Sequence, residues 1–413
     1  MRADVVVLGA GIVGVSVAVH LQKRGRAVLL VDREAPGLGT SFGNTGLIQR
    51  EAVYPYSFPR SWREILRHGR NRSIDTHYDW RALPRLAPFL VRYWWHSGTR
   101  RHAEIARKYA PLIERCVPEH LELAREAEAT ALLRPGGWIK IFRTPSALEE
   151  RVRAAELWAR EFGIEYAVLD PRALAEKEPH LDPALIGGLH FPEPVGVRDP
   201  HALTVAYVGL LERLGGAVAV GEATSLEQAR AGWRVATAKG PVEVPDVVVA
   251  LGAWSDVVIG PLGYRLPLGV KRGYHMHYRP AGNAVLNHTV LDAETGYALA
   301  PMARGIRLTT GAEFASRDAP KTPVQLERAE PVAKRLFPLG ERLDPEPWMG
   351  VRPCTPDMLP VIGKAPRHNG LWLAFGHAHH GLTLGPVTGR LLAEMMTGEE
   401  PSIDPAPYRA DRF

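Results

Sequence analysis

The N-terminal part of the chain alternates between apolar runs and a short glycine-rich turn. Residues 4–8 have the length and composition of a buried strand, and residues 12–24 fit a helix that Gly25 ends. A second apolar run, residues 27–31, stops at Asp32. A strand, a glycine turn, a helix and a second strand in this order predict a βαβ unit.

The rest of the pattern mixes helical and strand-like stretches. A helical, aromatic and basic stretch covers residues 61–128, whereas residues 137–142 and 188–191 alternate like strands of an antiparallel sheet. This alternation predicts an α/β fold with two interleaved domains, one doubly wound and entered three times, the other an α+β domain. Further helices are predicted at 199–214 and 383–396, and further strands at 217–220, 233–237, 247–251, 271–278, 305–311 and 371–375.

Composition and charge exclude several classes of protein. Of 413 residues, 46% are hydrophobic and 23% charged, which is typical of a globular protein and not of a disordered chain or a coiled coil. The net charge of +6 reflects a local excess of arginine at residues 60–107, and no long basic run or known motif indicates a nucleic-acid partner. Two cysteines, Cys116 and Cys354, cannot form a disulfide framework or a cysteine zinc site, so a reducing, cytoplasmic environment fits best.

Three glycines at the turn of the predicted βαβ unit have the spacing Gly9-x-Gly11-x-x-Gly14. Gly9 permits the tight turn, Gly11 lets the backbone approach a pyrophosphate, and Gly14 lets the helix pack closely on the strand. Asp32 ends the second strand, where a carboxylate accepts a hydrogen bond from a ribose 2′-OH and repels a 2′-phosphate. The unit therefore predicts binding of an adenine dinucleotide, either NAD or FAD.

The segment at residues 39–46, Gly-Thr-Ser-Phe-Gly-Asn-Thr-Gly, extends this site with the small and hydroxyl residues that a flavin needs as cover. Two C-terminal blocks accompany it, Trp-Met-Gly-Val-Arg-Pro-x-x-Pro-Asp at 348–357 and Phe-Gly-His-x-x-x-Gly-Leu-Thr at 375–383. With these motifs the whole chain resembles the D-amino-acid oxidase superfamily of FAD-dependent oxidoreductases, in its bacterial D-amino-acid dehydrogenase and glyphosate oxidoreductase-like branch. The resemblance favours FAD over NAD.

The resemblance implies a Rossmann-like FAD-binding domain of the glutathione-reductase type, interleaved with an antiparallel-sheet substrate domain. We expect the first at residues 1–50, 196–268 and 350–413, and the second at 51–195 and 269–349. The FAD is expected to be non-covalent, because relatives that tether it carry their cysteine seven residues before the aspartate matching Asp357, where Gly350 stands here. The predicted FAD-binding residues are Gly9, Gly11, Gly14, Asp32, Arg33, Thr40, Ser41, Asn44, Gly46, Gly252, Gly363, Gly376, His377, Gly381 and Thr383.

The loop at residues 376–381 also has a physical reason to face a flavin. It lies after a predicted strand and before a predicted helix, so free backbone N–H groups and the positive helix end can stabilise the anionic edge of a reduced flavin. Gly252 and Gly363 each follow an apolar strand, where the missing side chain lets the backbone pass close to a cofactor.

The substrate-binding residues follow from the family pattern Gly-x-Arg-Pro-x-x-Pro-Asp, in which the matching arginine holds the substrate carboxylate. The guanidinium of Arg352 offers the two-donor fork that this role requires, and a structural ion pair with Asp357 is the alternative. Tyr274 is either a second carboxylate contact or a half-buried sheet residue. Histidines at 379 and 380 replace small or apolar residues of the family and are expected to shape substrate preference. The predicted catalytic set is Arg352, Tyr274, His275, His379 and His380.

Five histidines form two short groups, at 275 and 277 and at 377, 379 and 380, that could bind a metal. No cysteine or acidic ligand is paired with either group along the chain, and His377 matches the family's Gly-His at the flavin. We therefore predict no metal site.

The resemblance implies FAD-dependent oxidative deamination of a small amino acid, either a D-amino acid or an imino acid of proline type. A hydride passes from the α carbon to flavin N5, and the imine is hydrolysed to a 2-oxo acid without a general base. The alternatives are an oxidase or dehydrogenase of N-substituted glycines, of the glycine, sarcosine or glyphosate type, and, from another class, a flavin-bound amino-acid sensor.

The electron acceptor is expected to be a quinone or another carrier, with O₂ as an alternative. The arginines and tryptophans of residues 60–107 suit peripheral contact with an anionic membrane, here the inner face of the cell membrane, where a quinone is found. The alternative is a helix packed into the second domain with a solvated arginine face. No oligomeric state is predicted.

Overall fold

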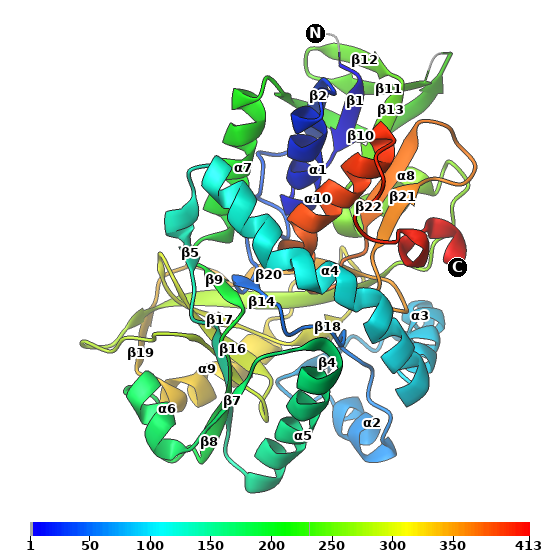
Figure 1. Ribbon diagram of the computed structural model, residues 1–413. Coiled ribbons are helices and arrows are strands. Elements are labelled where there is room, and N and C mark those ends of the chain that lie inside the picture. Colours follow the sequence, from blue (N-terminus) through cyan, green and yellow to red (C-terminus); the bar gives the residue numbers. More distant parts are fainter. Residues whose placement is uncertain (1–2, 231) are drawn as a thin grey trace.

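The computed structural model describes residues 3–230 and 232–413, in which two large β-sheets lie one above the other in Figure 1. The upper sheet has eight strands in the order β12-β11-β10-β2-β1-β13-β22-β21. From β10 to β22 the neighbouring strands run parallel, as in a doubly wound fold. The strands are β1 (Val5–Leu8), β2 (Val28–Asp32), β10 (Ala217–Ala229), β11 (Gly232–Thr237), β12 (Gly240–Val244), β13 (Asp246–Val249), β21 (Val361–Lys364) and β22 (Leu371–Phe375).

Both faces of the upper sheet are buried, which explains why its central strands are uninterrupted apolar runs. On β1, Val5 and Val7 pack in one core cluster, and Val6 and Leu8 pack in another on the opposite face. The first cluster is covered by helices α1 (Ile12–Lys23), α4 (Thr99–Glu126), α7 (Pro200–Arg213) and α10 (Gly381–Thr397), and the second by α8 (Ser255–Ile259).

The lower sheet has eleven strands, with the path β4-β18-β14-β17-β16-β15-β6-β8-β7 and with β19 and β20 also paired to β14. Most pairs are antiparallel, as predicted, but β15–β6 and β18–β4 are parallel because their strands are far apart in the chain and no hairpin constrains their direction. The strands are β4 (Thr76–Tyr78), β6 (Trp138–Phe142), β7 (Ala167–Leu169), β8 (Gly187–Phe191), β14 (Gly269–Pro280), β15 (Thr289–Asp292), β16 (Tyr297–Met302), β17 (Gly305–Thr309), β18 (Ala312–Phe314), β19 (Leu339–Arg342) and β20 (Trp348–Cys354).

The long strand β14 separates two environments. Tyr274, Met276 and Tyr278 point into the core cluster that also contains residues of α9 (Val324–Leu336). Because side chains alternate along a strand, Lys271 and Gly273 face the other way, towards the upper sheet. The domain boundary predicted at residue 350 falls inside β20, which stays paired with β14 as far as Cys354.

The predicted helical stretch 61–128 is divided into three helices. They are α2 (Trp62–Gly69), α3 (Leu83–His96) and α4, with β4 inserted between α2 and α3. The remaining elements are a small sheet of β3 (Leu47–Ile48), β9 (Val195–Val197) and β5 (Leu133–Arg134), and two peripheral helices, α5 (Pro145–Phe162) and α6 (Pro171–Lys177).

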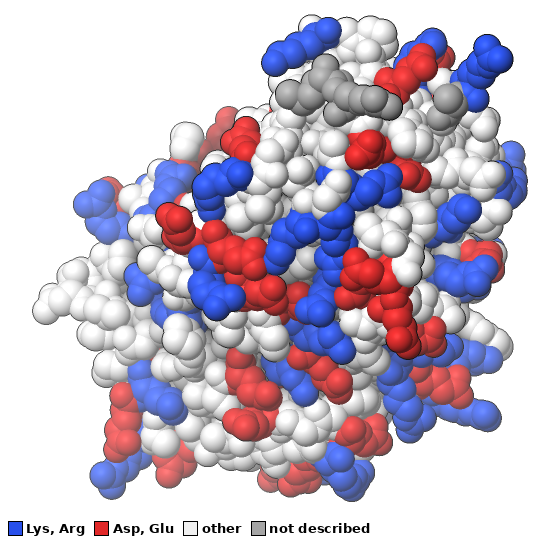
Figure 2. All heavy atoms as spheres, turned by 45° about the horizontal axis from the view of Figure 1, so that its top comes forward, with Lys and Arg blue, Asp and Glu red and all other residues white. Residues whose placement is uncertain are grey.

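No helix in the described part of the chain combines the length and apolar character needed to cross a bilayer. On the face drawn in Figure 2, basic and acidic side chains are intermingled and form no large patch of one sign. This arrangement agrees with the lack of a long basic run in the sequence.

Two buried histidines lie among the helices over the upper sheet. His120 of α4 donates from Nε2 to the carbonyl of Leu382 in α10 at 2.6 Å. Burial lowers the pKa of His120 to about 4, and burial together with nearby Lys23 and Arg24 lowers the pKa of His20 to about 3. Both rings are therefore neutral in the folded protein at neutral pH.

We expect the free energy of unfolding to decrease as the pH falls from about 6.5 towards 4. The folded pKa of each ring lies below its unfolded value of 6.5, so the unfolded chain takes up a proton that the folded chain excludes. Each ring contributes about 1.4 kcal/mol per pH unit within this window. Urea unfolding at several pH values measures the slope. His120→Gln should reduce this slope by the contribution of one proton, whereas His180→Gln, at an exposed position, should leave it unchanged. Equal slopes in all three proteins would contradict the assignment.

Candidate active site

A cavity of about 970 Å³ lies between the two sheets. Its wall includes the turn after β1, the residues after β2, the start of α10, and the inward-facing residues of β14 and β20. The carboxyl ends of parallel strands and the beginnings of two helices meet here, which is where doubly wound folds bind ligands.

The glycine turn after β1 is shaped as its spacing predicts. Gly9 has φ 106°, and a Cβ there would lie 2.5 Å from the carbonyl oxygen of Ala250. A Cβ on Gly14 would lie 1.9 Å from the carbonyl oxygen of Gly9, so the helix can approach the strand only without a side chain. Gly11 is the N-cap of α1 and has no side chain to cap the helix. Ser41 Oγ takes up the N–H of Ile12, which leaves the other N–H groups of the first turn for an anion in the cavity.

Asp32 and the segment 39–46 continue the cavity wall. Asp32 Oδ2 accepts a hydrogen bond from Ala10 N at 2.7 Å, which places its carboxylate beside the glycine turn. Ser41 Oγ accepts from Ile12 N at 3.0 Å, and Thr40 Oγ1 donates to the carbonyl of Val351 at 2.9 Å. Among the predicted FAD-binding residues, the cavity is lined by Gly9, Gly11, Asp32, Arg33, Thr40, Ser41, Asn44, Gly252, His377 and Gly381.

Other predicted FAD-binding residues act behind the wall. Thr383 Oγ1 donates to Leu47 O at 3.2 Å and accepts from Gln49 N at 3.3 Å, which joins α10 to β3. His377 lines the cavity, but its ring Nε2 is 2.9 Å from Thr388 Oγ1, so this ring atom is bonded to α10 and not to the cavity. The prediction for Gly363 does not fit: it lies on the edge strand β21, and a Cβ there would contact Met395 of α10. Gly14, Gly46 and Gly376 also lie off the cavity surface.

Arg352 contributes a guanidinium to the wall of the cavity. Its position on β20 pairs with Lys271 on β14, and a Cβ on Gly273 would lie 2.3 Å from its Nη2, so the guanidinium occupies space left by that glycine. Nη1 donates to Gly311 O at 2.9 Å, but the guanidinium forms no ion pair within the described residues. The alternative partner, Asp357, is bound instead by Arg412 at 2.9 Å. Arg352 is therefore not a structural partner of Asp357.

The carboxylate contact predicted for Tyr274 does not match the strand register. Its side chain is on the opposite face of β14, where its hydroxyl donates to Glu313 Oε2 at 2.8 Å and accepts from Thr322 N at 2.9 Å. Tyr274 therefore reaches the cavity wall without offering its hydroxyl to it. Three positions earlier, the side chain of Lys271 faces the cavity, with its Nζ 2.9 Å from Tyr93 Oη and 4.0 Å from the centre of that ring. Burial lowers the pKa of Lys271 to about 8. Sequence reasoning missed Lys271 because the face of each strand position depends on its partners.

The histidines at 379 and 380 both line the cavity but differ in their partners. His379 lines the cavity, its ring centre is 4.6 Å from that of Tyr56, and Nδ1 has no partner among the described residues. Burial, with the charges of Arg352 and Lys271, holds its pKa well below the usual range. His380 Nδ1 is 2.8 Å from Tyr109 Oη, and burial lowers the pKa of His380 to about 4. Both rings therefore present neutral polar groups.

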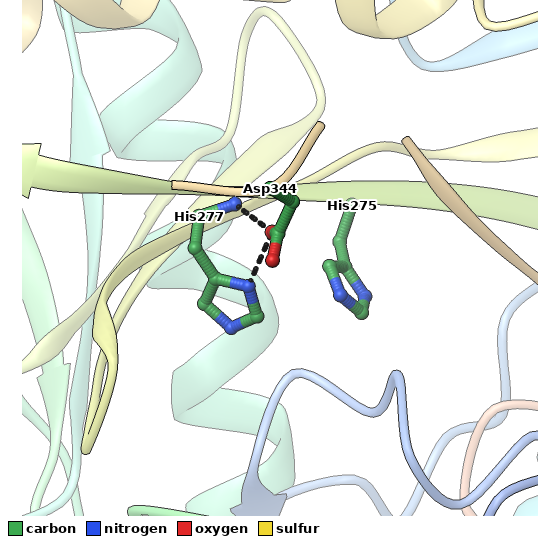
Figure 3. A group of neighbouring side chains, drawn as sticks. All are labelled: His275, His277 and Asp344. Carbon is green, nitrogen blue, oxygen red and sulfur yellow. Dashed lines mark hydrogen bonds and ion pairs between the residues drawn. The ribbon is translucent and has the colours of Figure 1, made fainter. Parts of the chain in front are cut away.

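His275, His277 and Asp344 form a cluster whose ligand atoms lie within 4.8 Å of one another (Figure 3). The expectation that no acidic residue accompanies these histidines was wrong, because the fold brings Asp344 to within 2.7 Å of His277 Nδ1. His277 Nε2 accepts from Arg307 Nε at 3.0 Å, so protein groups already occupy both ring nitrogens. The absence of a metal remains a prediction. The guanidinium of Arg307 supports it, because a cation already lies at His277 Nε2.

Comparisons with known proteins agree with this geometry. A family model described as FAD dependent oxidoreductase, DAO, matches residues 4–395. The chain belongs to the DAO family of FAD-dependent oxidoreductases. It is 28% identical to a D-amino-acid oxidase of Bradyrhizobium diazoefficiens, over 99% of this chain and 98% of that protein. It is 31% identical to a D-amino acid dehydrogenase of Paramagnetospirillum magneticum, over 99% and 98%. A glycine oxidase structure from Geobacillus kaustophilus is similar in fold, with TM-score 0.76, 23% identity, and 100% and 99% of the two chains covered.

The cavity fits the FAD of this family. The open N-terminus of α1 would hold the pyrophosphate, and Asp32 would hold the adenosine ribose. The N-terminus of α10, at Gly381, also has no side-chain cap and lines the same cavity, so it would face the flavin ring.

The Asp344–His277 pair of this DAO-family protein positions residues 39–46, here called the flavin loop, through Arg307. Asp344 accepts from both the backbone N and the ring Nδ1 of His277, which fixes the ring with Nε2 as an acceptor for Arg307. Arg307 Nη1 donates to the carbonyl oxygens of Phe42 (3.2 Å) and Asn44. The lower sheet therefore holds the loop that would cover the flavin.

Arg307→Met should weaken FAD binding, because the carbonyl groups of Phe42 and Asn44 lose a charged donor. Hydrogen bonds to a charged group contribute about 1.5–3 kcal/mol, so the FAD dissociation constant should rise by about 10-fold or more. Fluorescence titration of the apoprotein measures this constant. Arg304→Gln is the matched control, because it also removes an arginine near Asp344. Arg304 is half-exposed, and its Nη2 lies 3.1 Å from Asp344 Oδ1. The same FAD affinity in wild type and Arg307→Met would show that Arg307 does not order the loop.

Proposed function

We propose that the protein oxidises a small amino acid, either a D-amino acid or an imino acid of proline type, to its imine, which water converts to a 2-oxo acid. The observation that carries this proposal is the guanidinium of Arg352, which lines the FAD cavity without an ion-pair partner among the described residues. The relatives named D-amino acid dehydrogenase and D-amino-acid oxidase support the same substrate class.

Arg352 and Lys271 would bind the substrate carboxylate together. Arg352 supplies two parallel donors, and Lys271, paired with it across β14 and β20, supplies a second positive charge. Two fixed contacts orient the α carbon towards the centre of the cavity. Bound FAD supplies the hydride acceptor for the oxidation. The half-buried His379, whose pKa is held well below the usual range, adds no further positive charge beside the substrate amine.

Arg352→Lys should lower kcat/KM for amino acids by about 10- to 150-fold, because one fork bond to the carboxylate is lost. Anaerobic bleaching of the flavin absorbance, with D- and L-amino acids, proline and N-methylglycine, measures the effect. FAD content is the control, and it should not change. An undiminished rate with full FAD content would assign Arg352 to structure. Faster bleaching by N-methylglycine than by any primary amino acid would favour oxidation of N-substituted glycines.

We further propose that the surface of α2 and α3 contacts an anionic membrane and receives a lipid-soluble acceptor such as a quinone. Trp62 and Leu66, one turn apart on α2, are 77% and 66% exposed, and Trp80 and Trp95 are also exposed. The same stretch, residues 60–107, contains eleven arginines. The cavity wall includes Phe58, Pro59 and His68 beside this surface, which gives an acceptor a route towards the flavin. Apolar and basic residues together are typical of an interfacial helix.

The protein should co-sediment with vesicles that contain acidic lipid at low salt and leave them as the salt concentration rises. Trp62→Ser combined with Leu66→Ser should weaken this binding by removing the apolar contact. Val220→Ser, at an exposed position on β10, is the control and should bind as wild type does. Recovery in the supernatant with both neutral and acidic vesicles would reject the membrane contact and leave a diffusible acceptor.

A further inference from the structure

One part of the wall of the FAD cavity, on the lower sheet, is not used by the proposed reaction, and we call it the side chamber. Its wall combines aromatic and charged side chains from the segment after β3, from β6 and from α5. These residues, which define the side chamber, are Glu51, Tyr54, Trp138, Lys140, Arg151 and Trp158.

The side chamber begins close to the expected position of the flavin. Gln49 donates from its backbone N to Thr383 Oγ1 at the start of α10, and from Nε2 to Glu51 Oε1 at 3.0 Å. Two residues of extended chain span about 7 Å at most, so Glu51 lies within the reach of a substrate side chain from the α10 end of the cavity.

Lys140 is buried in the side chamber without a counter-ion at bonding distance. Its side chain is 9% exposed, and its Nζ lies 4.9 Å from the Trp138 ring centre, 5.4 Å from that of Trp158 and 5.0 Å from that of Phe191. It forms neither a hydrogen bond nor an ion pair with the described residues. Burial and the charge of Arg151 lower the pKa of Lys140 to about 8, while Glu51 opposes this shift.

Two further polar atoms in the side chamber have no partner within the described residues. They are Oε2 of Glu51, a residue only 3% exposed, and Nε1 of Trp138. The two side chains are neighbours, since burial raises the pKa of Glu51 and the Trp138 side chain is among the groups that oppose this rise, but no hydrogen bond of good geometry joins them. Buried polar atoms are nearly always hydrogen-bonded, so unpaired ones in a cavity indicate a ligand group. Lys140, Trp138 and Arg151 together offer more N–H donors than Glu51 offers acceptors, and their net charge is positive. A negatively charged ligand group with several hydrogen-bond acceptors would pair with these excess donors and offset the positive charge.

We propose that the side chamber binds a second carboxylate, on the side chain of the substrate, so that the enzyme selects acidic amino acids. This inference rests on the proposed function, because Arg352 must hold the α-carboxylate while Lys140 holds the distal one. Trp138 and Trp158 pack against the intervening methylene groups, and Trp138 Nε1 donates to the same carboxylate. An amide side chain of equal size satisfies the donors but not the charge of Lys140.

Isosteric substrates test the proposal in the FAD-loaded enzyme. Glutamate and glutamine, and aspartate and asparagine, differ mainly in charge, and both enantiomers of each are compared by anaerobic flavin bleaching. Wild type should prefer the acid by 10-fold or more in kcat/KM, a preference of about the size expected for one charge-assisted bond. Lys140→Gln should remove most of this preference, Lys140→Arg should keep it, and Lys239→Gln, on the exposed β11–β12 turn, should not affect it. Equal or faster oxidation of the amides by wild type would overturn the proposal.

A binding measurement separates this proposal from the proposed function. Glutarate, which cannot be oxidised as an amine, should raise the melting temperature and shift the flavin spectrum of wild type more than butyrate does, and Lys140→Gln should abolish the difference. If no amino acid bleaches the flavin but glutarate still binds through Lys140, the proposed reaction fails and the site stands. If amino acids bleach the flavin and glutarate binds no better than butyrate, the side chamber is not a carboxylate site.

Discussion

Buried positive charges without acidic partners are the constraint on which this structure depends. Arg352 and Lys271, joined by the β14–β20 ladder, line one cavity between the two sheets and form no ion pair with the described residues. An uncompensated buried charge costs several kcal/mol, and a bound anion offsets that cost. Gly273 fits this constraint, because a Cβ at that position would collide with the guanidinium of Arg352.

The upper sheet adds to the same electrostatic pattern. Helices α1 and α10 begin at the cavity without a side-chain cap, so two positive helix ends face the space where the pyrophosphate and the flavin of a DAO-family enzyme would lie. The parallel strands bring these two helix ends together although their sequences are far apart. The cavity is thus suited at each end to negative charge, whether of phosphate, of a flavin edge or of a substrate carboxylate.

The histidines of this chain follow a different principle. Burial keeps several of them neutral, among them His120, His377 and His380, so they supply hydrogen bonds without adding charge to a site already rich in cations. His277 shows the structural use of this property, since its ring joins Asp344 to Arg307 and through Arg307 to the flavin loop. A positive ring at that position would lose its acceptor atom and repel the guanidinium.

Local sequence was sufficient to predict the βαβ unit, the glycine turn and the C-terminal strand-loop-helix, because each depends on contiguous residues and on backbone rules that act over a few positions. The family resemblance, carried by a contiguous motif, pointed to Arg352, which lines the cavity. The tertiary structure alone decided which face of β14 meets the cavity. A shift of the β14 pairing register by one residue would turn the Tyr274 side chain towards the cavity and the Lys271 side chain away from it. It alone brought Asp344 to His277, and Glu51 and Lys140 to the same chamber, because these pairs are distant in sequence and only the packing of the sheets determines their proximity.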